Sequence, residues 1–339
     1  MKCILILCGY LIVSISCIIE ECKLFDDDHH GFGCWLKDIK IEAEENEINL
    51  IAKHDGRNDS DITWFQIIDS MLLNLPKNVF LKFVNLEKIF IENCTGFKNF
   101  DKAYFDTEIK YIHFTETDIE YVGDKVFVGL KSIDKLYLHS NKIRTLHKNA
   151  FKDLENLNEI SLNHNLIEHL DDDIFIGNLN LVFIILDNNR IKTINAKLFL
   201  RNINLENIEI ANNSISNIEE NFFERLEYLK ILDLSNNICI NDVITGDVYI
   251  SWLKIQHNFS DCIQNFIIKK ELELFSTNSQ VLTKQIQELR LKTESNLFYY
   301  LIILFVIILI SIAYYLFHKR IQRYAFGFES NQFTNLSNQ

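Results

Sequence analysis

The chain has 339 residues, eight cysteines and a formal net charge of −13. Its excess of acidic side chains disfavours nucleic acid or anionic polysaccharide as a ligand, because both are negatively charged. The length could hold one or two ordinary domains. No G-x-S-x-G, H-E-x-x-H or Gly-rich phosphate loop occurs, so we expect no enzyme activity, no cofactor and no metal site.

Residues 1–17 are expected to be a secretory signal peptide. Lys2 precedes an apolar run of residues 3–13, small residues follow, and cleavage after Ser16 or Cys17 fits this pattern. A membrane anchor is the alternative interpretation, but the run is short for a span and a better one comes later. Export would place the following residues in an oxidising compartment.

Residues 18–59 are expected to cap the N-terminal end of the next domain. Two alternating apolar runs, 36–41 and 48–50, are separated by a Glu-rich segment, which suggests a hairpin or a bent strand. The acidic clusters at 26–30 and 171–173 are expected to be solvated loops rather than calcium or other metal sites.

A sequence pattern recurs along residues 60–237. The copy that starts at Leu157 reads L-x-x-I-x-L-x-x-N-x-I-x-x-L-x-x-x-x-F, and the pattern returns with a period of 24 residues. Copies start at Ile133, Leu157, Leu181 and Leu205. The first apolar positions face one side of a short strand, and the later ones bring the returning chain over the same core. One turn cannot bury its apolar face alone, whereas stacked turns share a continuous core.

This pattern resembles the typical extracellular class of leucine-rich repeats, in which each turn carries a late Phe. Over about residues 60–262 the chain is similar to insect-type single-pass membrane repeat proteins, including Toll-like and adhesion ectodomains. The resemblance implies an α/β solenoid with a parallel β-sheet on the concave face and a mostly irregular convex side. Eight strands carry the Leu/Ile signature.

The Asn of the pattern has a structural role in this family. Its side chain carries two donors and one acceptor, and the resemblance implies that it satisfies backbone groups where each strand ends. The position is occupied by Asn141, Asn165, Asn189, Asn213 and Asn237. Upstream, the same register falls on Ser70, Cys94 and Thr117. The departures at Cys94 and Thr117, and a C-terminal cap with only two cysteines where many relatives have four, leave the subfamily open.

The cysteines that remain after export flank the repeats. Cys22 and Cys34 precede them, and Cys239 and Cys262 follow them. Each pair is expected to form a disulfide in a cap, because the end repeats would otherwise expose the shared core. The C-terminal cap, 238–262, should include Trp252 and Leu253. Cys94 is expected to be a buried free thiol; a reactive or intermolecular thiol is the alternative.

The C-terminal part should contain two helices. Residues 263–296 show helical spacing of apolar residues and are expected to form a stalk, in which a dimerising coiled coil is the alternative. Residues 297–317 carry no charged side chain and match the thickness of a bilayer. Lys319, Arg320 and Arg323 follow, which places the short tail, 318–339, in the cytoplasm. The expected protein is therefore a type I protein of the plasma membrane with extracellular repeats.

Two groups of surface residues follow from these predictions. N-x-S/T sequons outside the membrane predict glycans at Asn58, Asn93, Asn212 and Asn258. Asn335 is also in a sequon, but it should remain unglycosylated because it is expected on the cytosolic side. Large or aromatic side chains at outward strand positions predict a partner-binding surface on the concave face. These are Trp64, Phe90, Tyr111, His113, Tyr137, His139, Phe183 and Ile185.

The function expected from this reading is cell-surface binding of another protein, in recognition, adhesion or immune sensing. The partner would be a protein ligand or a cell-surface receptor. The alternatives are a structural scaffold of the membrane or matrix, and a co-receptor that signals through a partner chain.

Overall fold

The computed structural model describes residues 18–27, 30–41, 48–51, 57–75, 77–100, 108–219, 222, 225–246, 260–292 and 296–335. The expected signal peptide, Trp252, Leu253 and Asn258 lie outside the described residues. The chain divides into two units, Met1–Ile268 and Lys269–Gln339.

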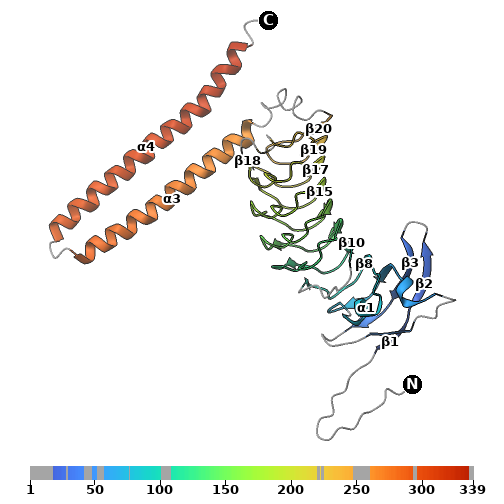
Figure 1. Ribbon diagram of the computed structural model, residues 1–339. Helices are drawn as coiled ribbons and strands as arrows, with labels where there is room; N and C mark the ends of the chain where they lie inside the picture. Colours follow the sequence, from blue (N-terminus) through green and yellow to red (C-terminus); the bar gives the residue numbers. More distant parts are fainter. Residues whose placement is uncertain are drawn as a thin grey trace. The chain divides into compact units, whose positions relative to one another are not determined.

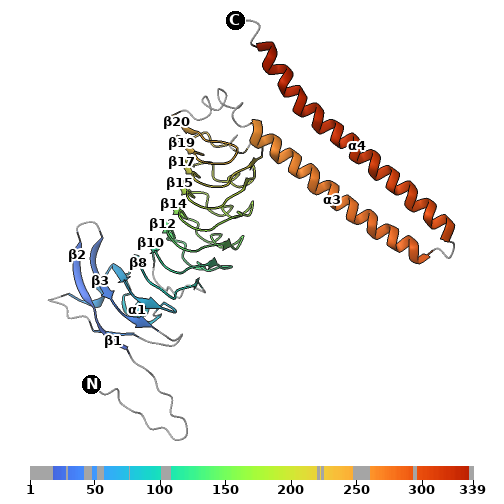
Figure 2. The same cartoon turned by 180° about the vertical axis from the view of Figure 1, so that it is seen from behind.

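The first unit is a coil of the chain with one strand in each turn. An 11-stranded sheet runs along one side of the coil, and its strands follow one another in chain order (Figures 1 and 2). The strands are β2 (Lys23–Asp27), β3 (Gly31–Lys37), β6 (Trp64–Ile68), β8 (Lys88–Glu92), β10 (Tyr111–Thr115), β12 (Lys135–Tyr137), β14 (Glu159–Ser161), β15 (Phe183–Ile185), β17 (Asn207–Glu209), β19 (Ile231–Asp233) and β20 (Val243–Thr245). Neighbours pair in parallel from β3 to β19, whereas β2 and β20 pair antiparallel at the two ends.

Shorter elements complete the turns. Two-residue strands pair in parallel beyond the main sheet. β4 (Lys40–Ile41) pairs with β7 (Met71–Leu72), and β16 (Thr193–Ile194) pairs with β18 (Asn217–Ile218). Between them, β11 (Tyr121–Val122) pairs with both β9 (Asn99–Phe100) and β13 (Thr145–Leu146). A 3-10 helix, η1 (Asp59–Asp61), and one α-helix, α1 (Lys77–Lys82), lie in the early turns. The returning side is otherwise irregular over the described residues, as expected for this pattern.

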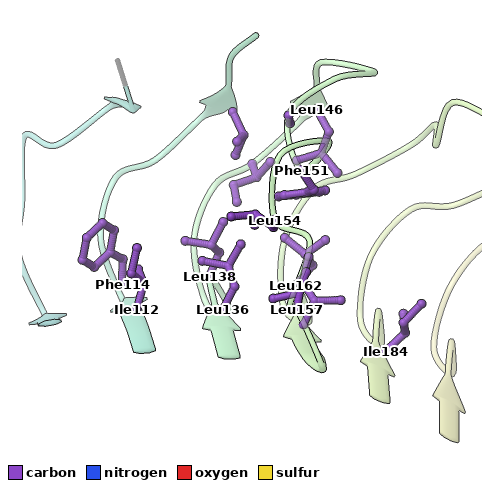
Figure 3. Packing of buried hydrophobic residues seen from close by; sticks show 14 of the residues in the cluster. Ile112, Phe114, Leu136, Leu138, Leu146, Phe151, Leu154, Leu157, Leu162 and Ile184 are labelled. Carbon is purple, nitrogen blue, oxygen red and sulfur yellow. The ribbon is translucent and has the colours of Figure 1, made fainter. Parts of the chain in front are cut away.

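The core is a continuous apolar column inside the coil. Side chains from successive turns, such as Ile112, Leu136, Leu162 and Ile184, are buried against the returning chain (Figure 3). The late Phe of each turn packs against its neighbours with ring centroids 5.9–6.2 Å apart, in the series Phe127, Phe151, Phe175, Phe199 and Phe222. The rings are stacked from Phe127 to Phe199, and that of Phe222 is tilted. Burial against both neighbouring turns is what makes the short strands stable.

The Asn register forms a hydrogen-bond ladder between turns. The side-chain amide of Asn165 donates to the carbonyl oxygens of Leu138 and Leu162, each at 2.9 Å, and its Oδ1 accepts from the backbone N–H of Ile143 at 3.0 Å. The same contacts recur with a period of 24 residues at Asn189 and Asn213. The residue before each register position has a positive φ of 50–55°, as at His164, which turns the chain sharply out of the strand.

Replacing Asn165 by Ala should lower the free energy of unfolding by about 1–3 kcal/mol, because backbone groups in two turns lose their partner. The matched control is Asn163→Ala on the concave face, where the side chain only accepts from the Ser161 hydroxyl at 2.5 Å. This control should change stability by at most about 0.5 kcal/mol. Thermal melts of both variants test the assignment, and equal losses would show that the register is wrong.

Upstream of Asn141, three other residues occupy the register. Ser70 accepts from the Ile39 N–H at 3.1 Å and donates to the Ile68 carbonyl at 2.8 Å, so it keeps part of the ladder. Thr117 donates its hydroxyl and its N–H to Asn141 Oδ1. Cys94 is a buried free thiol whose Sγ lies 3.3 Å from the Glu92 carbonyl oxygen. Burial raises the pKa of this thiol to about 11, which makes it unreactive.

A second Asn ladder on the returning side was not expected from the sequence. The fully buried Asn178 donates to the carbonyl oxygens of Phe151 and Leu154, each at 2.9 Å. One turn later, Asn202 donates to Phe175 at 3.0 Å and to Asn178 at 2.7 Å. The 24-residue spacing of Asn178 and Asn202 was the available signal, and these bonds fasten the turns that hold the Phe stack.

The N-terminal cap differs from the expected hairpin. The runs 36–41 and 48–50 do not pair with each other: β3 and β4 join the following turn, and β5 (Ile48–Ile51) pairs in parallel with β1 (Ile18–Glu21). The hairpin is formed earlier, by β2 and β3. The run 36–41 carries buried residues in the spacing of a repeat turn, so stacking on β6 buries them better than a local hairpin would.

Disulfides hold both ends of the first unit. Cys22 is bonded to Cys34 beside β2 and β3, and Cys239 is bonded to Cys262 after the last repeat. These are the pairs expected from the sequence. All but Cys239 are buried in the core, so each bond covers an end of the apolar column.

Two long helices follow. α3 (Ser260–Lys292) starts at the C-terminal disulfide, and α4 (Asn296–Asn335) contains the segment Tyr300–Lys319, with a mean hydropathy of 2.7. This segment is long and apolar enough to cross a bilayer. Its apolar side chains, such as Leu301 and Phe305, are more than half exposed, which suits contact with lipid.

Candidate functional site

The concave face of the sheet carries three outward positions in each turn. The parallel register places Lys88 between Trp64 and Tyr111, and it places His113 between Phe90 and Tyr137. Because the pairing is in register, residues of one position form a row across successive strands. The candidate site is built from these rows.

Six of the eight predicted partner-binding residues form one connected group, which we call the aromatic band: Trp64, Phe90, Tyr111, His113, Tyr137 and His139. Ring centroids lie 6.3 Å apart for Trp64 and Phe90, 5.2 Å for Phe90 and Tyr111, and 5.3 Å for His113 and His139. These are distances at which aromatic pairs attract each other. The band therefore crosses β6, β8, β10 and β12 as a connected group of rings.

The sequence predicted that all members of the aromatic band are exposed, but two of them are buried. Trp64 is 6% exposed and Phe90 is 7% exposed. The indole N–H of Trp64 donates to the Gly31 carbonyl at 2.7 Å, and the His30 ring lies 5.2 Å from Phe90. The hairpin of β2 and β3 therefore covers this end of the band, and an outward position on the strand does not mean exposure there.

The remaining two predicted residues lie apart from the band. Phe183 is 36% exposed and Ile185 is partly buried on β15. The strand β14, with Glu159 and Ser161 in its outward positions, separates them from Tyr137. The concave face thus has an aromatic part and an apolar part, with a polar strip between them.

Hydrogen bonds fix the border of the aromatic band. The Tyr137 hydroxyl donates to Glu159 Oε1 at 2.6 Å, and Lys135 Nζ donates to Oε2 of the same carboxylate at 2.8 Å. Burial, together with the bond to Glu159, raises the pKa of Tyr137. Burial also raises the pKa of Tyr111 to about 12. Both phenols are therefore neutral at physiological pH and serve as hydrogen-bonding aromatic surfaces.

The histidines of the band are held in the neutral form. Burial, with a smaller contribution from the charge of His139, lowers the pKa of His113 from 6.5 to about 4. Burial and the neighbouring His164 lower the pKa of His139. The Tyr111 hydroxyl lies 3.3 Å from His113 Nδ1. A neutral imidazole can accept that hydrogen bond, whereas a protonated one cannot.

Acid should destabilise the fold through His113. Its depressed pKa means that its contribution is complete above about pH 6.5 and is lost as the pH falls towards 4. Because the ring is partly exposed, we expect a loss of about 1–2 kcal/mol between pH 7 and pH 4.5 relative to His113→Asn. Asp187, whose pKa burial raises to about 6, acts in the opposite direction, but it is present in both proteins and cancels in the comparison.

Urea titrations of both proteins at the two pH values measure this difference. A gap in unfolding free energy that does not change with pH would contradict the assignment of His113 as the acid-sensitive group.

Acidic side chains occupy the C-terminal part of the concave face. After burial, the charges of Glu209 and Asp233 contribute to raising the pKa of Asp187, and Asp187 accepts from the Ala211 N–H at 2.6 Å. Elsewhere, Asp26 pairs with Arg57 at 2.6 Å, and Asp172 accepts from Asn195 at 2.5 Å. The part of the chain that the structure describes contains no cluster of three or more His, Cys, Asp or Glu side chains that could hold a metal ion.

Three of the predicted glycosylation sites lie on the described surface. Asn58, Asn93 and Asn212 are exposed. Asn93 and Asn212 occupy the positive-φ position that ends a concave strand, so glycans on them would line the same edge of the sheet.

Comparison with known proteins agrees with this geometry. The family model for the leucine rich repeat matches residues 107–167, and the model for the BspA type leucine rich repeat region matches residues 139–243. No curated protein matches the chain significantly. Repeats of this kind are protein-interaction scaffolds rather than enzymes.

Solved structures with similar folds include TLR13 in its complex with ssRNA13, at 22% identity and a TM-score of 0.48. That match covers 57% of this chain, which spans only 29% of the TLR13 chain. Internalin C2 from Listeria monocytogenes is 18% identical, with a TM-score of 0.42, and the match covers 53% of this chain and 74% of the internalin. The repeating pattern, the stacked parallel strands and the family matches together identify residues 107–243 of this chain as a leucine-rich repeat region.

Proposed function

We propose that this protein binds another protein at the cell surface through its concave face, in recognition, adhesion or immune sensing. The observation that supports this most is the aromatic band, whose partly exposed members, Tyr111, His113, Tyr137 and His139, lie next to a polar strip. Aromatic side chains with hydrogen-bonding tips are enriched where proteins bind each other. The exposed ring of Phe183 extends the apolar surface beyond the strip.

The proposal includes a type I orientation in the plasma membrane, with the repeats outside. Two disulfides favour an oxidising compartment for the repeats, and the basic residues after the apolar segment of α4 favour the cytoplasm for the C-terminus. Glycopeptide mass spectrometry tests this orientation. It should find glycans at Asn93 and Asn212 and none at Asn335. A glycan at Asn335 would show that the chain has the opposite orientation in the membrane.

Binding is tested with the full chain displayed on cells and a library of surface proteins. The double variant Tyr137→Asp with Phe183→Asp should lose partner binding, because two charges replace apolar contact area on the concave face. The matched control is Tyr228→Asp, which changes an aromatic residue that is 61% exposed and lies before β19, off the concave strand. Partners that bind all three proteins equally would show that another surface is used.

The alternatives predict different results in the same experiment. A scaffold of the membrane or matrix would show no saturable soluble ligand. A co-receptor would bind a second membrane receptor in the same cell, and an adhesion protein would aggregate the cells that express it.

A further inference from the structure

A hollow lies beside the aromatic band at its N-terminal end. It has a volume of about 550 Å³ and opens on the concave face where β2, β3, β6 and β8 meet. This volume is within the range of small-ligand sites and exceeds that of one large side chain. Rings from the hairpin and from the sheet form the walls: Phe25, His30, Trp35, Trp64 and Phe90.

The walls are held in place before any ligand arrives. The Trp64 ring lies directly over Gly33, where a Cβ atom would come within 1.9 Å of the indole. The bond from the indole N–H to the Gly31 carbonyl fixes the ring in this orientation. Gly33 is therefore needed for the close approach of the Trp64 ring to the backbone. Because the ring is already held in place, binding a ligand does not require the loss of its side-chain conformational entropy.

The charged groups of the hollow are Lys37 and Glu92. Lys37 Nζ lies 2.9 Å from Asp69, so its charge is already compensated. Among the ion pairs formed by the described residues, none includes Glu92. Burial raises the pKa of Glu92, the Gln66 side chain lowers it by a hydrogen bond, and the charge of Glu116 raises it further. The hollow therefore holds a half-buried carboxylate for which the part of the chain that the structure describes supplies no ion-pair partner.

We propose that the hollow receives a basic side chain, arginine or lysine, from the protein partner. The cation would meet aromatic faces, which attract it through their quadrupoles, and would form a charge-assisted hydrogen bond with Glu92. An apolar side chain would use the rings but would leave the carboxylate unpaired. This inference rests on the proposed function, because it specifies the chemistry of the partner on the same face.

The test uses short peptides and the full chain in detergent. The probes are acetyl-Gly-Arg-Gly-amide, the lysine analogue, the neutral citrulline analogue and the leucine analogue. Quenching of tryptophan fluorescence reports binding, because Trp35 and Trp64 line the hollow. The arginine or lysine peptide should bind about tenfold more tightly than the citrulline and leucine peptides.

Two variants locate the charge. Glu92→Gln should remove the preference for the basic peptide, because the two peptides then meet the same neutral site. The matched control, Glu116→Gln, changes a neighbouring carboxylate that does not line the hollow, and it should keep most of the preference. Thermal melts of both variants establish that each is folded, and the citrulline comparison in the unchanged protein does not depend on any variant.

Equal binding of citrulline, leucine and arginine peptides, or no saturable binding of any peptide, would overturn the proposal. A preference that persists in Glu92→Gln would overturn the assignment of the carboxylate. Failure here differs from failure of the proposed function: a partner that depends on Tyr137 and Phe183 could still be found when no basic peptide binds. Conversely, peptide binding could persist when no partner uses the concave face.

Discussion

Replacing Phe175 by Ala is expected to lower the free energy of unfolding by about 3–5 kcal/mol. The side chain is fully buried and stacks between Phe151 and Phe199, with ring centroids 6.0 and 5.9 Å away. The loss combines the transfer free energy of the ring with the cost of the cavity. Both neighbouring turns are fastened by Asn178 and Asn202, so the cavity cannot close by a small movement of one turn.

Chemical denaturation of the detergent-solubilised protein measures this loss. Phe183→Ala is the matched control, because it removes the same ring from an outward position that is 36% exposed. It should cost at most about 1 kcal/mol. If the two variants unfold at the same denaturant concentration, the Phe stack does not support the solenoid as described.

Loss of the C-terminal disulfide should destabilise the last turns by about 2–5 kcal/mol. Cys239 follows the final repeat and Cys262 lies at the start of α3, where its side chain is fully buried. In a stacked array each turn contacts only its neighbours, so an unfastened end opens first. The variant Cys239→Ser should therefore expose the amides of β17 and β19 to exchange while β8 stays protected.

Hydrogen exchange followed by mass spectrometry gives this comparison along the chain. Cys22→Ser is the matched control at the other end, where it should raise exchange in β3 and β6 and leave β19 protected. Uniform exchange in both variants would mean that the solenoid opens as one unit and that the disulfides do not act as local caps.

Much of the solenoid follows from the sequence because the same pattern of apolar and Asn residues recurs in each turn. The alternation of apolar residues identifies the buried side of each strand, and Leu162 and Phe175 are buried as their positions in the pattern predict. Asn165 makes the backbone bonds that the family resemblance implies. The second ladder at Asn178 and Asn202 could also have been found from its spacing.

Other features depend on residues that meet only after folding. The sequence placed Trp64 and Phe90 on the concave side, but their burial comes from a hairpin whose turn residues, Gly31 and His30, lie more than 30 positions earlier. The non-repetitive cap has no period from which its strand pairing could be inferred. For the same reason, the grouping of the Glu92 carboxylate with the rings of the hollow became apparent only in the structure.

The sequence by itself thus determined the repeat, its core and its ladder, because these depend on neighbours at a constant spacing. The tertiary structure alone decided which outward side chains are exposed, which of them join into the aromatic band, and where the hollow lies. Alternation along a strand tells which face a side chain occupies, whereas its exposure depends on whatever other part of the chain comes to cover that face.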